Sequence, residues 1–244
     1  MKTTLYILVF VFAAFGSKAQ SLEEIISKSI TATGGADKVA KLQSYKVEGK
    51  LSLGQGMEAP FTIEALQDKG ARFEMSFQGM TMVQCVQGEK GWGIMPFQGK
   101  KDAEPMTPDQ VRSMADQMDI QGLLYDYAKK GHAVEYIGKE DLEGTEVHKI
   151  KITKKNGDLV YKYLDAETFL ELKSSTTVKV NDAETKNDML ASNYKQVDGY
   201  TLPFSLINRN TIAGQSFDQT MTIDKITINP VIDESKFVMP AKKP

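Results

Sequence analysis

Residues 72–77 read RFEMSF, and this stretch shows the alternation that decides the fold. Phe73, Met75 and Phe77 are separated by polar residues, so in an extended strand they would share one face. The same period of two recurs along most of the chain, in residues 45–53, 61–65, 150–152, 161–163, 202–206 and 217–223. We therefore predict a large sheet with one apolar face.

Short turn signals separate these alternating stretches. Asn156-Gly157 and Asp198-Gly199 favour the left-handed backbone of tight hairpin turns. Further glycine-containing turns are expected at residues 54–56, 88–91 and 213–214. The spacing predicts about ten or eleven strands in hairpin order, which is a strongly curved antiparallel meander with few helices.

Two regions have helical rather than strand periodicity. Ser21 and Glu24 have the spacing of a capping box, and they open an amphipathic stretch to about residue 31 that a second short helix at 36–42 follows. Thr107-Pro108 predicts another helix start, with a continuation to about residue 130. Because the apolar face of the sheet must be covered, these helices are its expected covers.

The first nineteen residues are typical of an export signal. Residues 5–15 are uninterrupted apolar sequence, too short for a membrane span, which needs about 20 residues. We predict cleavage between Ala19 and Gln20, leaving residues 20–244 as a single domain without a transmembrane segment. The only cysteine is Cys85, so no cysteine follows the predicted cleavage site to carry a lipid anchor, and the mature chain is expected to be soluble outside the cytoplasm.

Charge and composition argue against several classes of function. Cleavage would remove Lys2 and Lys18 but no acidic residue, so the formal charge would fall from −2 to about −4. The chain contains three arginines, Arg72, Arg112 and Arg209. A mildly acidic chain with so few arginines lacks the positive surface that nucleic-acid binding requires.

The sequence shows few residues suited to catalysis. Its two histidines, His132 and His148, have no further histidine or cysteine within four residues, so a metal site is not predicted. Cys85 lies in an alternating strand without a neighbouring base, and no nucleophile or phosphate-binding motif is present. We predict no catalytic residue and no cofactor, although two carboxylates from distant strands would leave no local signal in the sequence.

Methionine is unusually concentrated. Eight of the eleven methionines that follow the predicted leader lie between residues 57 and 118, in a region that also holds five of the aromatic residues: Phe61, Phe73, Phe77, Trp92 and Phe97. Flexible thioether side chains recur on surfaces that accept varied apolar ligands, but they also fill ordinary cores. Both interpretations remain open at this stage.

Three passages resemble a known family. Residues 73–97 contain two strands, Gly88-x-x-x-Trp92 and then Pro96-Phe97; residues 144–172 contain Tyr161-x-Tyr163-Leu164-Asp165; and residues 198–237 contain Asp198-Gly199-Tyr200-x-x-Pro203-Phe204 and Ile228-Asn229-Pro230. Together they resemble the outer-membrane lipoprotein-sorting proteins of the LolA type, and in particular a sorting-like branch of secreted Bacteroidota proteins. The resemblance covers most of residues 21–240.

This resemblance implies a mainly β fold, an incomplete and unclosed antiparallel β-barrel of about eleven strands in which helices lid an apolar cavity. It further implies a periplasmic protein that carries acyl chains without covalent chemistry. The family's arginine-proline pair is replaced by the stretch 69–72, so Lys69 or Arg72 would supply the basic residue. The expected cavity residues are Phe73, Met75, Phe77, Met82, Trp92 and Ile94, and the expected lid residues are Val111, Met114 and Met118.

Three functional hypotheses follow. The leading one is a periplasmic carrier or chaperone for a lipid or an acylated lipoprotein, with possible protein partners in the outer or inner membrane. The second is an envelope sensor or adaptor that binds a protein partner through a sheet edge or the same half-barrel. The third is an enzyme acting on glycans or lipids.

Overall fold

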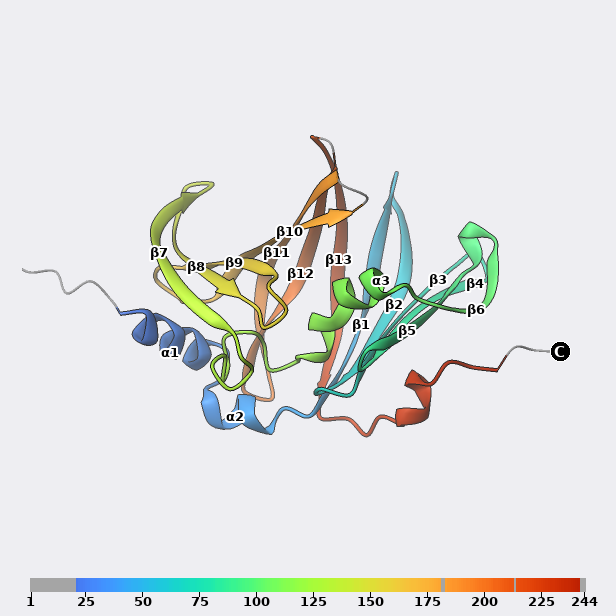
Figure 1. Ribbon diagram of the computed structural model, residues 1–244, viewed down its shortest axis with the longest axis horizontal. Coiled ribbons are helices and arrows are strands. Elements are labelled where there is room, and N and C mark those ends of the chain that lie inside the picture. The colour runs from blue at the N-terminus through green and yellow to red at the C-terminus, as the bar shows by residue number, and fades with distance from the viewer. Residues whose placement is uncertain (1–20, 181–182, 213, 242–244) are drawn as a thin grey trace, which may run out of the picture.

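The computed structural model describes residues 21–180, 183–212 and 214–241 of the chain (Figure 1). Its strands form one antiparallel sheet in the order β6-β5-β4-β3-β2-β1-β13-β12-β11-β10-β9-β8-β7, which leaves two free edges. The strands are β1 (Ser44–Gly54), β2 (Met57–Leu66), β3 (Gly70–Phe77), β4 (Met80–Gln87), β5 (Lys90–Met95), β6 (Lys100–Pro105), β7 (Ala133–Leu142), β8 (Thr145–Thr153), β9 (Leu159–Asp165), β10 (Glu171–Val180), β11 (Ala183–Val197), β12 (Tyr200–Ile212) and β13 (Gln215–Ile228). The mainly β, unclosed fold is as predicted.

The thirteen described strands exceed the predicted eleven. Both edge strands, β6 and β7, are missing from the predicted set. β6 reads KKDAEP, and an irregularity in register beside Gly138 interrupts β7. Polar sequence and bulges are common at sheet edges because they discourage pairing with other chains, and they also weaken the alternation from which strands are counted.

The two halves of the chain meet where β1 pairs with β13. The register shifts between Glu48 and Gly49, and a Cβ atom on Gly49 would lie only 2.3 Å from the carbonyl oxygen of Thr222. Glycine is therefore required at this bulge, because any side chain would collide with the neighbouring strand. The sheet is strongly curved, with β1–β6 on one side of its concave face and β7–β10 on the other (Figure 1); we call the space inside this curve, which side chains partly fill, the hollow.

The three α-helices begin where the sequence predicted them, whereas the 3-10 helices η1 and η3 were not predicted and the expected helix to about residue 130 ends earlier. They are α1 (Leu22–Ala32), α2 (Ala36–Lys41), α3 (Pro108–Met114) and the short 3-10 helices η1 (Pro96–Gln98), η2 (Ala115–Met118) and η3 (Glu234–Phe237). Ser21 and Thr107 cap α1 and α3 as expected. Residues 119–131 form successive turns instead of a helix, although Leu123 and Leu124 are buried. Their apolar character therefore reflects packing and not helical periodicity.

Packing differs between the two sides of the hollow. On β8 and β9 the concave face is covered by α1 and the 119–131 turns, which form a buried cluster of Ile25, Ile26, Leu123, Leu124, Ile150, Ile152, Val160 and Leu164. We call β7–β9 with these covers the sealed limb. We call β1–β4 the open limb. The cluster on its concave face extends onto β12 and β13, is made of strand residues alone, and includes many that are only partly buried.

The convex face of β4 and β5 has a cover that was not predicted from the sequence. Residues 232–237, including η3, pack on Val83, Cys85 and Trp92, with Ile232 and Phe237 buried. β4 carries apolar residues on both of its faces: Val83 and Cys85 lie on the convex face, whereas Met82 and Val86 point to the concave face. Apolar residues on both faces of a strand indicate that both faces are covered, and this was the signal in the sequence for a second covering segment.

The remaining two predictions concern the leader cleavage site and membrane-spanning segments. Ala19 and Gln20, the expected cleavage site, lie outside the described residues. Within the described ranges, no helix is both long enough and apolar enough to cross a bilayer.

Candidate functional site

The structure brings four of the six predicted cavity residues together on the concave face of the open limb. Met75 of β3 is opposite Met82 of β4 on one side and Phe61 of β2 on the other. Phe73 stacks on Phe61, with ring centroids 5.9 Å apart. Phe77 follows on the same face of β3, as the alternation predicted.

Only part of this apolar surface is buried. Met75 is buried, but six neighbouring side chains that pack on the same cluster are only partly buried. They form what we call the apolar wall, and they are Leu53, Ile63, Phe73, Phe77, Met82 and Leu206. Beyond them lie Met57, Met80 and Phe97, with exposed fractions of 43%, 36% and 44%. An accessible surface of aromatic, aliphatic and thioether groups is suited to binding a flexible apolar ligand.

Tyr45 lies at the base of the apolar wall and was not predicted as a site residue. Its side chain packs on both the wall's cluster and the cluster under α3. Burial raises its pKa to about 12, and no described residue forms a hydrogen bond with its hydroxyl. The alternation of residues 45–53 placed Tyr45 on the apolar face, but nothing in the sequence marked its hydroxyl as unpaired.

Trp92 and Ile94 do not share this surface, so the predicted set does not line one cavity. Trp92 is opposite Cys85, and Ile94 is opposite Val83, all on the convex face. The Trp92 indole donates a 2.8 Å hydrogen bond to the carbonyl of Phe237. Side chains alternate between the two faces of a strand, so Trp92 and Ile94 lie on the face of β5 opposite to Gly91 and Gly93, which face the hollow.

Lys69 and Arg72 also lie away from the apolar wall. Lys69 Nζ is 2.5 Å from a Glu234 carboxylate oxygen. The Arg72 guanidinium pairs with Glu74, lies 5.2 Å from the Trp92 ring centroid, and donates a 3.0 Å hydrogen bond to the Lys236 carbonyl. Both basic residues therefore fasten residues 234–237 to the convex side.

Two pockets are present elsewhere on the described chain. One has a volume of about 470 Å³ near the lower edge of β5, and its walls include Trp92, Met106, Val111, Phe237 and Met239. The other, of about 240 Å³, lies beside α1 and is lined by Glu23, Ile26, Ser27, Ile30, Thr31, Ala36 and Tyr127. Neither is lined by the apolar wall.

The predicted lid residues cover the lower end of the open limb, where α3 lies in the hollow (Figure 1). Val111 and Met114 are buried against Ala65, Ala71 and Val86, and Met118 packs on the same cluster. Gly91 permits this approach, since a Cβ atom there would be 3.0 Å from Val111 and 2.9 Å from the Met106 sulfur. The upper part of the apolar wall lies beyond this contact.

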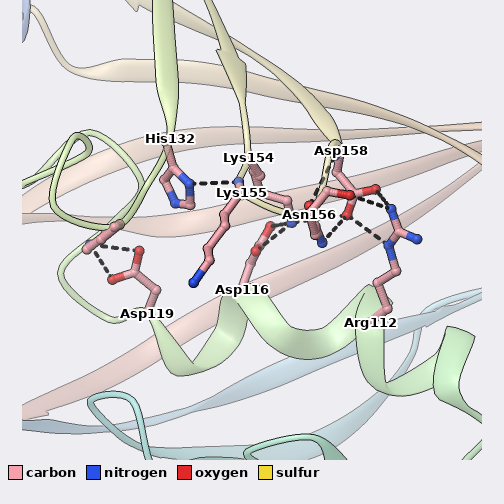
Figure 2. Close-up of polar contacts among 9 residues, drawn as sticks. Arg112, Asp116, Asp119, His132, Lys154, Lys155, Asn156 and Asp158 are labelled. Carbon is pink, nitrogen blue, oxygen red and sulfur yellow. Dashed lines mark hydrogen bonds and ion pairs between the residues drawn. The ribbon is translucent and has the colours of Figure 1, made fainter.

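Ion pairs fasten α3 and η2 to the β8–β9 turn of the sealed limb (Figure 2). Arg112 forms a two-pronged contact with the Asp158 carboxylate, and Lys154 Nζ lies 2.8 Å from Asp116. Burial alone would raise the pKa of Asp158, but hydrogen bonds from Arg112 and Asn156 and the charge of Lys154 lower it below its usual value. The Lys154 side chain is only 9% exposed.

The end of η2 and the first of the turns after it also form hydrogen bonds with the open limb. The amide of Asp68 donates a 3.0 Å hydrogen bond to the Met118 carbonyl, and Gln67 donates to Asp119 at 3.3 Å. Lys130 neutralises Asp119 at 2.6 Å. The α3–η2 segment thus bridges both limbs. The contacts that join it to the two limbs link residues far apart in the chain, so no local sequence signal announced them.

The cysteine and the two histidines are buried or partly buried, and both histidines have hydrogen-bond partners. Cys85 is fully buried, and burial raises its pKa to about 12. His148 is 1% exposed and its Nδ1 lies 3.0 Å from the Tyr136 hydroxyl, and burial lowers its pKa. His132 accepts a hydrogen bond from the amide of Lys155 (Figure 2). Within the described ranges no three acidic, histidine or cysteine side chains are grouped to hold a metal ion.

Comparisons by sequence and by structure give different results. No protein-family model matches the sequence, and no curated protein sequence matches it. Solved structures, in contrast, match over nearly the whole chain.

Three of these structures show the common architecture. A LolA superfamily protein from Nitrosomonas europaea has a TM-score of 0.57 at 10% identity, over 90% of this chain and 98% of that one. A lipoprotein-sorting domain from Vibrio parahaemolyticus has 0.56 at 12%, over 88% and 94%. A DUF1329 family protein from Desulfovibrio piger has 0.57 at 15%, over 88% and 96%. The chain therefore has the fold of the LolA superfamily and of outer-membrane lipoprotein-sorting domains.

Proposed function

We propose that this protein is a non-catalytic periplasmic carrier that binds an acyl chain of a lipid or lipoprotein on the apolar wall. The observation that carries the proposal is the set of phenylalanine, methionine and aliphatic side chains on the concave face, which the covers of the fold leave only partly buried. The fold shared with a lipoprotein-sorting domain supports it.

Apolar contact alone would give useful affinity. Burying a methylene group contributes about 0.8 kcal/mol, so a chain with about six buried methylenes would gain about 5 kcal/mol before the cost of ordering it. Met57, Met80 and Met82 have flexible thioether side chains and can adapt to chains of different length. The wall therefore suits a family of acyl chains more than one rigid ligand.

The α3–η2 segment would act as a lid in this proposal. Its apolar contacts with Ala65, Ala71 and Val86 cover the lower part of the concave face. Displacing it would extend the apolar wall toward Tyr45. The segment is held to the sealed limb by ion pairs of Arg112 and Lys154, and it contributes no residue to the buried cluster of that limb. Its movement would therefore leave that cluster intact.

Binding of a fluorescent fatty acid tests the proposal, together with extraction and mass spectrometry of lipids that co-purify with the mature protein. We expect the purified protein to carry lipid and to bind the probe. Phe77→Ser and Met82→Ser should each weaken probe binding severalfold. Ile137→Ser is the matched control, because Ile137 is also apolar and exposed but lies at the bulge of the edge strand β7, away from the apolar wall.

Three outcomes would contradict the proposal. A protein that is always empty and does not bind the probe is not an acyl carrier. Recovery of one stoichiometric protein partner without lipid would instead favour the adaptor hypothesis. Equal weakening by Ile137→Ser would show that the probe binds nonspecifically to exposed apolar side chains.

A further inference from the structure

The concave face changes in chemistry just above the apolar wall, on the central strands β12 and β13. Leu206 is opposite Met221 at the level of the wall, and the next pair on the same face is Asn208 and Gln219. Successive pairs on one face are about 7 Å apart along a strand. A polar surface therefore begins one such step from the apolar wall.

On β11 the same face carries Met189, which is opposite Asn208 and 37% exposed, and then Asn187. Asn187 is opposite Asn210, and their side chains are joined by a 2.7 Å hydrogen bond. We call Asn187, Asn208, Asn210 and Gln219 the amide patch. Phe217, opposite Asn210 on β13, is 60% exposed and lies at its margin.

Most hydrogen-bonding capacity in the amide patch is unused. The Asn187–Asn210 bond uses one donor of Asn187 and one acceptor of Asn210. Asn208 contacts the Met221 sulfur at 3.8 Å, and the Gln219 side chain has no hydrogen-bond partner in the described part of the chain. A carboxamide offers two N–H donors and an acceptor oxygen, so the patch presents both kinds of group to a ligand.

Charges on the same strands point to the other face. Arg209 lies between Asn208 and Asn210 in sequence, and its guanidinium pairs with Asp218 on the convex face at 2.7 and 2.8 Å. Asp188, next to Asn187, is held there by Lys173 and Lys186 at 3.2 and 3.0 Å. The alternation thus separates a charged convex face from an uncharged concave patch.

This separation favours an uncharged ligand group. A charged headgroup placed on the patch would lose hydration without gaining an opposite charge. Hydroxyl groups both donate and accept hydrogen bonds, as carboxamides do, so a hydroxyl-rich headgroup matches the patch. An extended peptide is a poorer match, since peptides usually add to sheet edges, whereas β11–β13 lie in the interior of the sheet.

We propose that the amide patch binds the uncharged, hydroxyl-rich headgroup of an amphiphile, such as the sugar of a glycolipid, while its acyl chain lies on the apolar wall. This inference rests on the proposed carrier function, and it adds the headgroup class. Phe217 would contact the less polar side of the sugar ring.

Chain-matched probes test the assignment. Dodecyl maltoside and dodecanoate carry alkyl chains of similar length but differ in headgroup, and each can displace a fluorescent fatty acid from the full mature protein below its micelle concentration. Dodecyl maltoside should bind at least about fivefold more tightly, the effect of one net hydrogen bond. Asn208→Leu and Gln219→Leu should each remove this advantage, because each replaces a carboxamide of the amide patch with an apolar group.

The control is Gln196→Leu, which removes an amide from the convex face of the same strand as Asn187. Gln219 is exposed, so its variant should fold even if Asn208→Leu does not. Equal affinity for both probes, an unchanged preference in Gln219→Leu, or tighter binding of an N-dodecanoyl dipeptide would each overturn the assignment. Failure of every probe to bind would refute the carrier function itself.

Discussion

The sealed limb and the open limb share the same alternation of apolar and polar residues, but they differ in how far their inward-facing apolar side chains are covered. On the sealed limb, Ile150 and Leu164 are fully buried beneath α1 and the 119–131 turns. On the open limb, Phe73 and Phe77 occupy equivalent inward positions but are only partly buried. Alternation therefore determines which residues face the hollow, whereas the placement of covers determines which of them are available to a ligand.

The largest expected effect is on the stability of the sealed limb. Ile152→Ala removes a fully buried side chain, and loss of its contacts with a cavity left behind should lower the free energy of unfolding by about 2–5 kcal/mol. Met80→Ala, on the rim of the open limb, should change it by no more than about 0.5 kcal/mol. Urea denaturation of both variants measures the difference. Similar losses would show that the limbs are not distinct.

A smaller effect is expected where α3 joins the sealed limb. Lys154→Met removes the partner of Asp116, while Asp158 keeps its contact with Arg112. We expect a loss of about 1–3 kcal/mol in the free energy of unfolding, the usual range for hydrogen bonds to charged groups. Faster hydrogen exchange of the amides of residues 111–118 should accompany it.

Lys155→Met is the control, since the neighbouring Lys155 side chain is exposed. If both variants behave alike, the ion pairs of Figure 2 do not hold the lid.

The smallest expected effect depends on pH and is confined to the sealed limb. His148 packs against Tyr136 and Phe169, with Lys28 over the Phe169 ring. Burial, and next the charge of Lys139, lower its pKa below 6.5, while Glu146 and Asp165 act in the opposite direction. The folded state therefore binds this proton less readily than the unfolded state does.

Because the folded pKa is depressed, the stability from neutral His148 is complete above pH 6.5 and is lost as the pH falls through the folded pKa. Urea denaturation between about pH 7.5 and 5 should show this slope, and His148→Gln should reduce it. Burial also lowers the pKa of His132, the only other histidine, so His132→Gln should reduce the slope as well but not abolish it. A slope that vanishes only with His132 would contradict the assignment.

Much of the fold was readable from the sequence because alternation and turn dipeptides are local signals. They correctly placed Phe73, Met75 and Phe77 on one face of β3. The same rule, applied separately to each strand, could not relate the faces of different strands. Trp92 and Ile94 were therefore assigned to the wrong side of β5, since only the register of β4 with β5 fixes their direction.

Long-range contacts set the remaining limits on prediction. The ion pair of Arg112 with Asp158 and the cover that Phe237 provides for Trp92 depend on how the sheet curves. The amide patch was similarly hidden. Its residues lie on three strands, and only the pairing of β11, β12 and β13 brings them together.

Photo-crosslinking tests the central claim, that the open limb binds an apolar chain and the sealed limb does not. A fatty acid with a diazirine near its methyl end would be bound to the mature protein, irradiated, and located by peptide mass spectrometry. We predict labelling within residues 73–82 and protection by excess unlabelled fatty acid. Competable labelling confined to residues 148–164, or to the pocket formed by Trp92 and Phe237, would contradict the account.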